Sequence, residues 1–303
     1  MKKDLSYYKK FIKDSWIAFR PFSLTLAIGS TALGIVAAYR MGLLFKNNIT
    51  FDIINITLIT LAGLCAQAGA NLINDYFEGS FRYYRTSKSK VKFLGVERSY
   101  FDIYVFLWGM CCFGLASLIG IYLVLITNIQ MLFIGLIGIV GAYAYTGEPF
   151  VYKRRGLGAI LSFILMGPLM VYGAYFVFGI DFSWYPIIIS LPPSFLIPAL
   201  MLSNEMRDFK RDSRLSVGTL SVRIGSSTSK FIYTCLLGSS YIATILLVIL
   251  GLYPFQSLLV LATLPLAKKC YRSVSNFEHT GIPYTNNLHW LFTLIILSTL
   301  ILF

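Results

Sequence analysis

The chain has 303 residues, of which 57% are hydrophobic and 13% are charged, and its formal net charge is +13. A mean hydropathy of +0.71 excludes a soluble globular domain and indicates an integral membrane protein. The apolar runs are continuous rather than short and alternating, which argues against a β-barrel and for membrane-spanning helices.

The amino-terminal segment combines apolar and basic residues at helical spacing. Leu5, Tyr8, Phe11, Ile12 and Trp16 would share one face, with lysines between them. This pattern predicts an amphipathic helix that lies in the membrane interface. The open alternative is a basic tail that only sets the topology of the chain.

Nine apolar spans follow, each near the length that a bilayer of about 30 Å requires. They cover 15–41, 52–74, 101–126, 129–145, 157–179, 184–203, 231–251, 254–268 and 286–303. We expect the short spans to tilt or to begin in the interface. No linker divides the chain, so one domain over 1–303 is expected. The predicted fold is an all-α polytopic membrane protein, two four-helix units plus a ninth helix around a central cavity.

Basic residues sort onto alternate loops. With these spans, every Lys and Arg except Arg40 and Lys46 falls on the side of the amino terminus. The positive-inside rule then places the amino terminus in the cytoplasm and the carboxyl terminus outside, in a multi-pass protein of the cell membrane. Since topology explains the positive charge, we expect no nucleic-acid partner.

The second span ends in a polar stripe. Gln67, Asn71, Asn74, Asp75 and Glu78 recur every three or four residues of an otherwise apolar helix. Polar groups inside a membrane are costly and usually face a cavity or a partner. For Gln67 and Asn71, bonds between helices are an equal alternative, whereas Asp75 and Glu78 favour a functional site.

The sixth span ends in a second acidic cluster. Asp208 and Asp212 are four residues apart and share a helical face, where a divalent cation would relieve their repulsion. The alternative is a solvated helix end in which Arg207 and Arg211 pair with the aspartates. Because spans two and six run in the same direction, both acidic ends are expected on the cytoplasmic side.

Two facing carboxylate clusters suit Mg²⁺, which prefers oxygen ligands and is often shared with a substrate phosphate. The metal would neutralise charge on a departing diphosphate, and nearby Arg and Lys would add donors. A diphosphate at the mouth of an apolar bundle implies a lipid tail inside it. The substrate class that fits is a polyprenyl diphosphate, with the active site open to the cytoplasm.

These motifs resemble those of UbiA-type intramembrane prenyltransferases. Residues 74–78 resemble the first half of the family's N-D-x-x-D-x-x-x-D motif, and residues 207–212 with 218–225 resemble its second motif and the segment after it. The pattern is most similar to the 1,4-dihydroxy-2-naphthoate prenyltransferase branch of menaquinone synthesis. Further matches to that branch are at 20–24, 145–150, 153, 156–158 and 167–169.

The resemblance implies a nine-helix bundle in which Mg²⁺ bridges the two motifs and the diphosphate. The implied metal ligands are Asp75, Glu78, Asp208 and Asp212, and the implied catalytic residues are Asp75, Asp208 and Asp212. The expected substrate-binding residues are Arg20, Asn71, Asn74, Arg82, Tyr145, Lys153, Arg154, Asn204 and Arg207. The implied reaction attaches a prenyl chain to an aromatic quinone precursor.

The sequence departs from the family pattern at three positions. Glu78 replaces the second Asp of the first motif, Arg82 stands at its last acidic position, and Glu205 follows Asn204 where the branch has a second Asn. Two alternatives therefore stay open. One is a prenyltransferase with another acceptor, such as a non-aromatic alcohol, and the other is a non-catalytic isoprenoid carrier.

Overall fold

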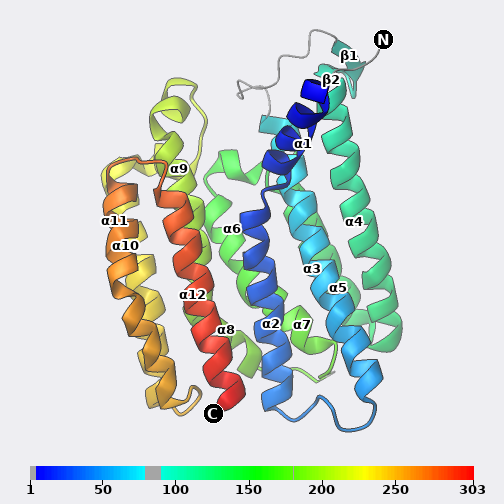
Figure 1. Ribbon diagram of the computed structural model, residues 1–303, viewed down its shortest axis with the longest axis vertical. Coiled ribbons are helices and arrows are strands. Elements are labelled where there is room, and N and C mark those ends of the chain that lie inside the picture. Colours follow the sequence, from blue (N-terminus) through cyan, green and yellow to red (C-terminus); the bar gives the residue numbers. More distant parts are fainter. Residues whose placement is uncertain (1–4, 79–89, 180) are drawn as a thin grey trace.

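The computed structural model describes residues 5–78, 90–179 and 181–303, which form a bundle of long helices with one short β-hairpin (Figure 1). The elements of the first half are α1 (Leu5–Phe19), η1 (Pro21–Ser23), α2 (Leu24–Arg40), α3 (Ile49–Glu78), β1 (Lys90–Phe93), β2 (Val96–Ser99), α4 (Tyr100–Ile126) and α5 (Ile129–Ala144). The antiparallel β1–β2 pair was not expected, because the sequence indicated only a basic loop there.

The second half begins with the one-turn helix η3 (Tyr152–Arg155) and continues as helices broken by prolines and glycines. The remaining elements are α6 (Gly158–Ile164), the π-helical turn η4 (Leu165–Leu169), α7 (Met170–Phe176), α8 (Tyr185–Ser194), α9 (Leu196–Arg214), α10 (Leu220–Ile249), the 3-10 helix η5 (Phe255–Thr263), α11 (Leu264–Ser275) and α12 (Gly281–Leu302).

Each predicted span lies on a helical segment. Within the described part of the chain, seven segments are long and apolar enough to cross a membrane. Helix α5 has only 16 residues, and η5–α11 is not among the seven. The polytopic all-α fold is confirmed, whereas nine crossings stay a prediction.

Breaks within the spans coincide with proline and glycine. Arg20, between α1 and α2, has φ 51°, a left-handed conformation immediately before Pro21. Gly167 has non-helical φ −91° and ψ −107° next to Pro168, between α6 and α7. Two consecutive prolines precede the break between α8 and α9 at Phe195. Because proline removes a donor and obstructs the preceding turn, these are the places where a helix can bend.

Apolar packing and polar bonds join the helices that surround the site. The main core contains Leu33 of α2, Val171 of α7, Leu196 of α9, Tyr233 of α10 and Phe292 of α12, each almost fully buried. Hydroxyl pairs also connect the later helices, namely Tyr233 with Thr285 at 2.7 Å, Tyr241 with Thr263 at 2.8 Å and Ser257 with Thr299 at 2.9 Å. Such bonds hold helices together where the surrounding lipid gives no hydrophobic drive.

Helices α3 and α9 run in the same direction and end at the upper end of the bundle in Figure 1, the end at which α1 lies. The end of α12 lies at the opposite end (Figure 1). Both acidic motifs therefore reach the same end of the molecule.

Candidate active site

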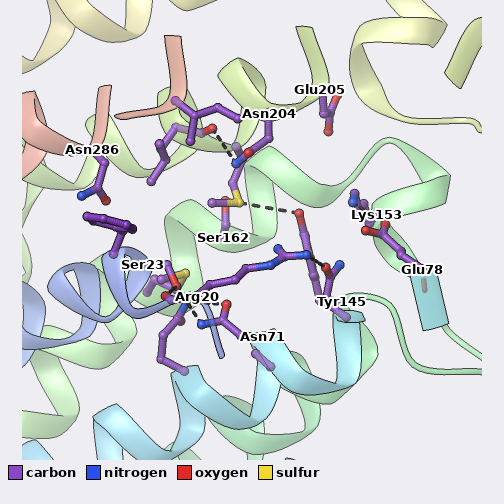
Figure 2. A pocket seen from close by; sticks show the side chains of 18 of the residues that line it. Arg20, Ser23, Asn71, Glu78, Tyr145, Lys153, Ser162, Asn204, Glu205 and Asn286 are labelled. Carbon is purple, nitrogen blue, oxygen red and sulfur yellow. Dashed lines mark hydrogen bonds and ion pairs between the residues drawn. The ribbon is translucent and has the colours of Figure 1, made fainter. Parts of the chain in front are cut away.

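A cavity of about 790 Å³ lies among α1, α3, α5, η3, α9 and α12 (Figure 2). Its walls change character along the helices. On α9 the lining residues run from Leu200 and Met201 through Asn204 to the acids Asp208 and Asp212. On α3 they run from Ala66 through the amides to Glu78. The cavity is therefore apolar inside the bundle and charged at the ends of α3 and α9, which suits a ligand with an apolar tail and an ionic head.

Amides in the middle of the α3 stripe hold the break between α1 and α2. Asn71 Nδ2 donates to the backbone oxygen of Phe19 at 2.9 Å and to Ser23 Oγ at 2.7 Å. Gln67 Nε2 donates to the same Ser23 oxygen at 3.4 Å. Both alternatives drawn from the sequence apply, since these amides line the cavity and also bond between helices.

Arg20 reaches from this break across the cavity. Its guanidinium donates to Asn74 Oδ1, and Figure 2 shows the side chain extended toward Tyr145. A left-handed backbone at a non-glycine residue costs about 1–3 kcal/mol and is common where a side chain is held for function. The strained backbone at Arg20 thus directs its guanidinium group into the cavity.

Lys153 and Glu78 form an ion pair at the charged end of the cavity (Figure 2). The Lys153 backbone nitrogen donates to the backbone oxygen of Tyr145 at 3.1 Å. The Lys153 ammonium lies 5.6 Å from the centre of the Tyr145 ring. The pair links η3 to α3, and the tyrosine ring adds a cation–π contact.

A second arginine fixes the loop that presents these cations. Arg223 Nε donates to the Gly218 oxygen at 2.8 Å, and its terminal nitrogen donates to the Arg154 oxygen at 3.2 Å. Gly156 has φ 78°, and a Cβ there would lie 2.7 Å from Arg223 Cδ. Only glycine permits both this backbone and this approach. Burial raises the pKa of Tyr152 in the same loop, so its hydroxyl stays protonated.

The acids of α9 are paired with arginines of their own helix. Arg207 donates to both oxygens of Asp208 at 2.7 and 2.6 Å, and Arg211 contacts Asp208 at 3.1 Å and Asp212 at 2.8 Å. These are the pairs that the alternative interpretation of this segment requires. Both aspartates nevertheless line the cavity, and Asp212 is only 5% exposed.

Sequence reasoning assigned no role to Glu205, although its departure from the branch pattern was noted. Its side chain is 3% exposed and lines the cavity three residues before Asp208 on α9. The signal that could have found it is its spacing: Glu205 comes two residues after the end of the predicted span 184–203, three residues before Asp208 and seven before Asp212, on the same helical face.

Most of the predicted site residues line this single cavity. They are Arg20, Asn71, Asn74, Glu78, Tyr145, Lys153, Arg154, Asn204, Arg207, Asp208 and Asp212. Asp75 is fully buried in α3 and is not among the lining residues, so its role as a metal ligand stays a prediction. Arg82 lies outside the described residues.

The donor set fits a magnesium ion that arrives with a phosphate ligand. Glu78, Asp208 and Asp212 supply carboxylate oxygens from two helices to one cavity. In the part of the chain that the structure describes, no three acidic, His or Cys side chains converge into a metal cage. Mg²⁺ does not need such a cage, because it retains waters and uses one or two carboxylates plus substrate phosphate.

Comparison with known proteins shows the family to which the chain belongs. The UbiA prenyltransferase family matches residues 33–281. The chain belongs to the UbiA prenyltransferase family. This UbiA-family chain is 26% identical over 270 residues to a Bacillus subtilis 1,4-dihydroxy-2-naphthoate octaprenyltransferase, covering 88% of this chain and 83% of the relative. It is 25% identical to the Xenopus tropicalis UbiA prenyltransferase domain-containing protein 1, covering 88% and 75%.

Solved structures share the fold of this UbiA-family chain. An Archaeoglobus fulgidus UbiA homologue bound to GPP and Mg²⁺ has a TM-score of 0.62 and 12% identity, covering 94% of this chain and 99% of the other. A digeranylgeranylglyceryl phosphate synthase has a TM-score of 0.60 and 18% identity, covering 98% of each chain. The protein is thus a multi-pass membrane prenyltransferase by family.

Proposed function

We propose that the protein transfers a prenyl chain from a polyprenyl diphosphate to an aromatic acceptor, with Mg²⁺ as cofactor. The acceptor is a quinone precursor such as 1,4-dihydroxy-2-naphthoate. One observation supports this most directly: acids and cations from α3, η3 and α9 meet at one end of a cavity whose other end is apolar. Its volume of about 790 Å³ lies in the range of small-molecule sites.

Different parts of the cavity would bind the diphosphate, the metal and the prenyl chain. Lys153, Arg154 and Arg207 would bind the diphosphate oxygens, while Met166 and Met170 belong to the apolar wall around the prenyl chain. Bound Mg²⁺, held by Glu78, Asp208 and Asp212 with Asp75 as the remaining candidate, would neutralise charge on the departing diphosphate. The apolar wall excludes water, which would otherwise capture the allylic cation.

The bond changes balance without a redox partner. The C1–O bond of the donor breaks and the diphosphate keeps the bonding pair. An electron-rich ring carbon forms the new bond to C1, and the ring then loses a proton or a substituent to regain aromaticity. In this proposal the aromatic ring of Tyr145, which lines the cavity, would stabilise positive charge on the donor.

We further propose that the charged end of the cavity faces the cytoplasm and that the protein resides in the cell membrane. The cations at this end belong to two segments that the positive-inside rule places in the cytoplasm, namely η3 with Lys153 and Arg154 and the end of α9 with Arg207 and Arg211. Alkaline phosphatase fused after Phe303 should be active outside the cell, and an inactive fusion would contradict this orientation.

The test is incubation of the purified protein with Mg²⁺, farnesyl or geranylgeranyl diphosphate and a panel of aromatic acids, read by mass spectrometry. We expect a prenylated product that disappears with EDTA, returns with Mg²⁺ and is lost in Asp75→Ala and Asp208→Ala. Absence of product with every donor and acceptor would contradict the proposal. Mg²⁺-independent binding of unchanged donor would instead identify a carrier.

A further inference from the structure

The β1–β2 hairpin lies at the upper end of the bundle in Figure 1, next to the start of α4. In its antiparallel register Val91 is opposite Arg98 and Phe93 is opposite Val96. Opposite residues share a face of a hairpin and alternate residues of a strand do too, so Phe93 and Arg98 lie on one face. This face contacts the end of α3, through Tyr76.

Tyr76 is the residue at which the hairpin, α3 and α4 meet. Its side chain is only 2% exposed, and it directly follows Asp75 in the chain. Its ring centre lies 6.4 Å from that of Phe93 in β1 and 4.8 Å from that of Phe106 in α4, and the latter two rings are 5.5 Å apart. Aromatic rings at these separations attract one another, so the hairpin is packed onto both helices.

Arg98 contacts Tyr76 in two ways. Its Nη1 donates to the backbone oxygen of Tyr76 at 3.3 Å, and its guanidinium carbon lies 4.4 Å from the centre of the Tyr76 ring. A planar guanidinium can cover an aromatic face and still donate from its edge, which an ammonium cannot do. One side chain of the hairpin thus holds both the backbone and the ring of the same α3 residue.

The bond from Arg98 falls where α3 most needs a cation. Helix α3 ends at Glu78, so the Tyr76 oxygen is one of the last four carbonyls, which have no partner within a helix. Cations stabilise this negative end of a helix dipole, but the last turn of α3 contains Asp75 and Glu78 and no basic residue. Arg98 supplies from the hairpin the cation that the turn itself lacks.

Arg98 can influence the site only through α3. It is not among the residues that line the cavity, whereas Glu78 lines it and pairs with Lys153. Successive residues of an α-helix point about 100° apart, so Tyr76 and Glu78 point to nearly opposite sides of α3. The hairpin therefore grips the helix from behind the carboxylate that faces the cavity.

We propose that Arg98 is a positioning residue, which holds the last turn of α3 through Tyr76 so that the acids of this turn are in place for magnesium. The inference rests on the proposed Mg²⁺-dependent transfer and assigns the hairpin a role in it. Mg²⁺ demands nearly ideal octahedral geometry, so a carboxylate on a frayed helix end would bind it less well. Residues that orient metal ligands typically change metal affinity by about 10–100-fold when they are replaced.

The first test measures the helix end itself and needs no turnover. Arg98→Met keeps an unbranched apolar chain against the Tyr76 ring but loses the charge and the donors. Hydrogen exchange followed by mass spectrometry should show the amides of 75–78 exchanging at least about tenfold faster than in wild type. The matched control is Lys92→Met, which removes an exposed cation from the same hairpin and should leave this exchange unchanged.

The second test separates positioning from general stability. With farnesyl diphosphate and 1,4-dihydroxy-2-naphthoate, the Mg²⁺ concentration for half-maximal activity should rise about tenfold in Arg98→Met, while kcat at saturating Mg²⁺ stays within about threefold. A smaller folded fraction would instead lower activity equally at every Mg²⁺ concentration. Arg98→Lys keeps a cation at the helix end, so it should require less Mg²⁺ than Arg98→Met.

Each contrary result overturns the inference in a recognisable way. Unchanged exchange at 75–78 in Arg98→Met would show that Arg98 does not hold α3. Faster exchange with an unchanged Mg²⁺ requirement would leave Arg98 a structural role only. Equal effects of Lys92→Met, or an Arg98→Lys enzyme as impaired as Arg98→Met, would remove the specific contact as the cause. In all these cases prenyl transfer by wild type stands, whereas a wild type that forms no product would overturn both proposals.

Discussion

The carboxyl-terminal ends of α3 and α9 bound the same cavity but use their polar side chains in different ways. On α3, Asn71 and Gln67 form hydrogen bonds with residues at the break between α1 and α2, which is distant from them in the sequence. On α9, Asp208 and Asp212 pair with arginines of the same helix. The α3 amides therefore maintain the shape of the site, whereas the α9 pairs can exchange partners.

The energetics support this distinction. Buried amides that lose their partners cost about 1–3 kcal/mol each, because the bonded groups are left unsatisfied. The pair between Arg207 and Asp208, whose side chains are 30% and 20% exposed, contributes only about 0–1 kcal/mol. Substitution of the α3 amides should consequently lower stability, and substitution of Asp208 should lower activity with little change in folding.

The largest expected effect is on α9. Asp208→Ala should lower kcat by about 10³-fold, because the central carboxylate of the charged end is removed. The melting temperature should stay within a few degrees of wild type. The matched control is Asp52→Asn near the start of α3, outside the cavity lining, which should keep wild-type turnover. A stable, fully active Asp208→Ala enzyme would remove α9 from the site.

The next effect concerns the ion pair that joins η3 to α3. Lys153→Met should lower kcat/KM for the prenyl diphosphate by about 10²-fold, mainly through KM, because a donor to the diphosphate is lost. The control Lys92→Met changes a lysine of β1, which is outside the cavity lining. Steady-state kinetics at varied donor concentration provide the measurement, and an unchanged donor KM would show that Lys153 serves only to hold Glu78.

A smaller effect on turnover, with a larger one on folding, is expected on α3. Asn71→Ala should destabilise the protein by about 1–3 kcal/mol and lower activity by roughly tenfold, since the Arg20 backbone loses its support. Thermal unfolding in detergent measures the first effect and product formation the second. Thr57→Ala, at the opposite end of α3, is the control. An Asn71→Ala protein with unchanged melting temperature but no turnover would assign Asn71 to direct substrate binding.

The smallest effect is expected from the loop clamp. Arg223→Gln should raise the donor KM by about threefold, because the loop that presents Lys153 and Arg154 loses two backbone contacts but keeps Gly156. Lys230→Gln, later on the same helix, removes the same charge without these contacts and should leave KM unchanged. If Lys230→Gln raised the donor KM as much as Arg223→Gln, the effect would come from the lost positive charge and not from the lost backbone contacts.

The helical spans and their acidic ends could be predicted because a bilayer imposes a simple rule. About 20 apolar residues are needed for each crossing, and acids at the end of an apolar helix are costly enough to be informative. The same rule fails for short-range detail. The π-helical turn at Leu165–Leu169 and the hairpin β1–β2 leave no comparable apolar signature.

By itself, the sequence determined the membrane class, the parallel acidic motifs and the resemblance to UbiA prenyltransferases, since all three are carried by composition and spacing along one helix. Only the tertiary structure decided how each polar atom is used. The ion pair between Lys153 and Glu78, the position of Asp75 outside the cavity lining, and the bond between Glu205 and the start of α10 were all decided in this way. These outcomes depend on contacts between helices far apart in the chain, and spacing within a single helix does not encode them.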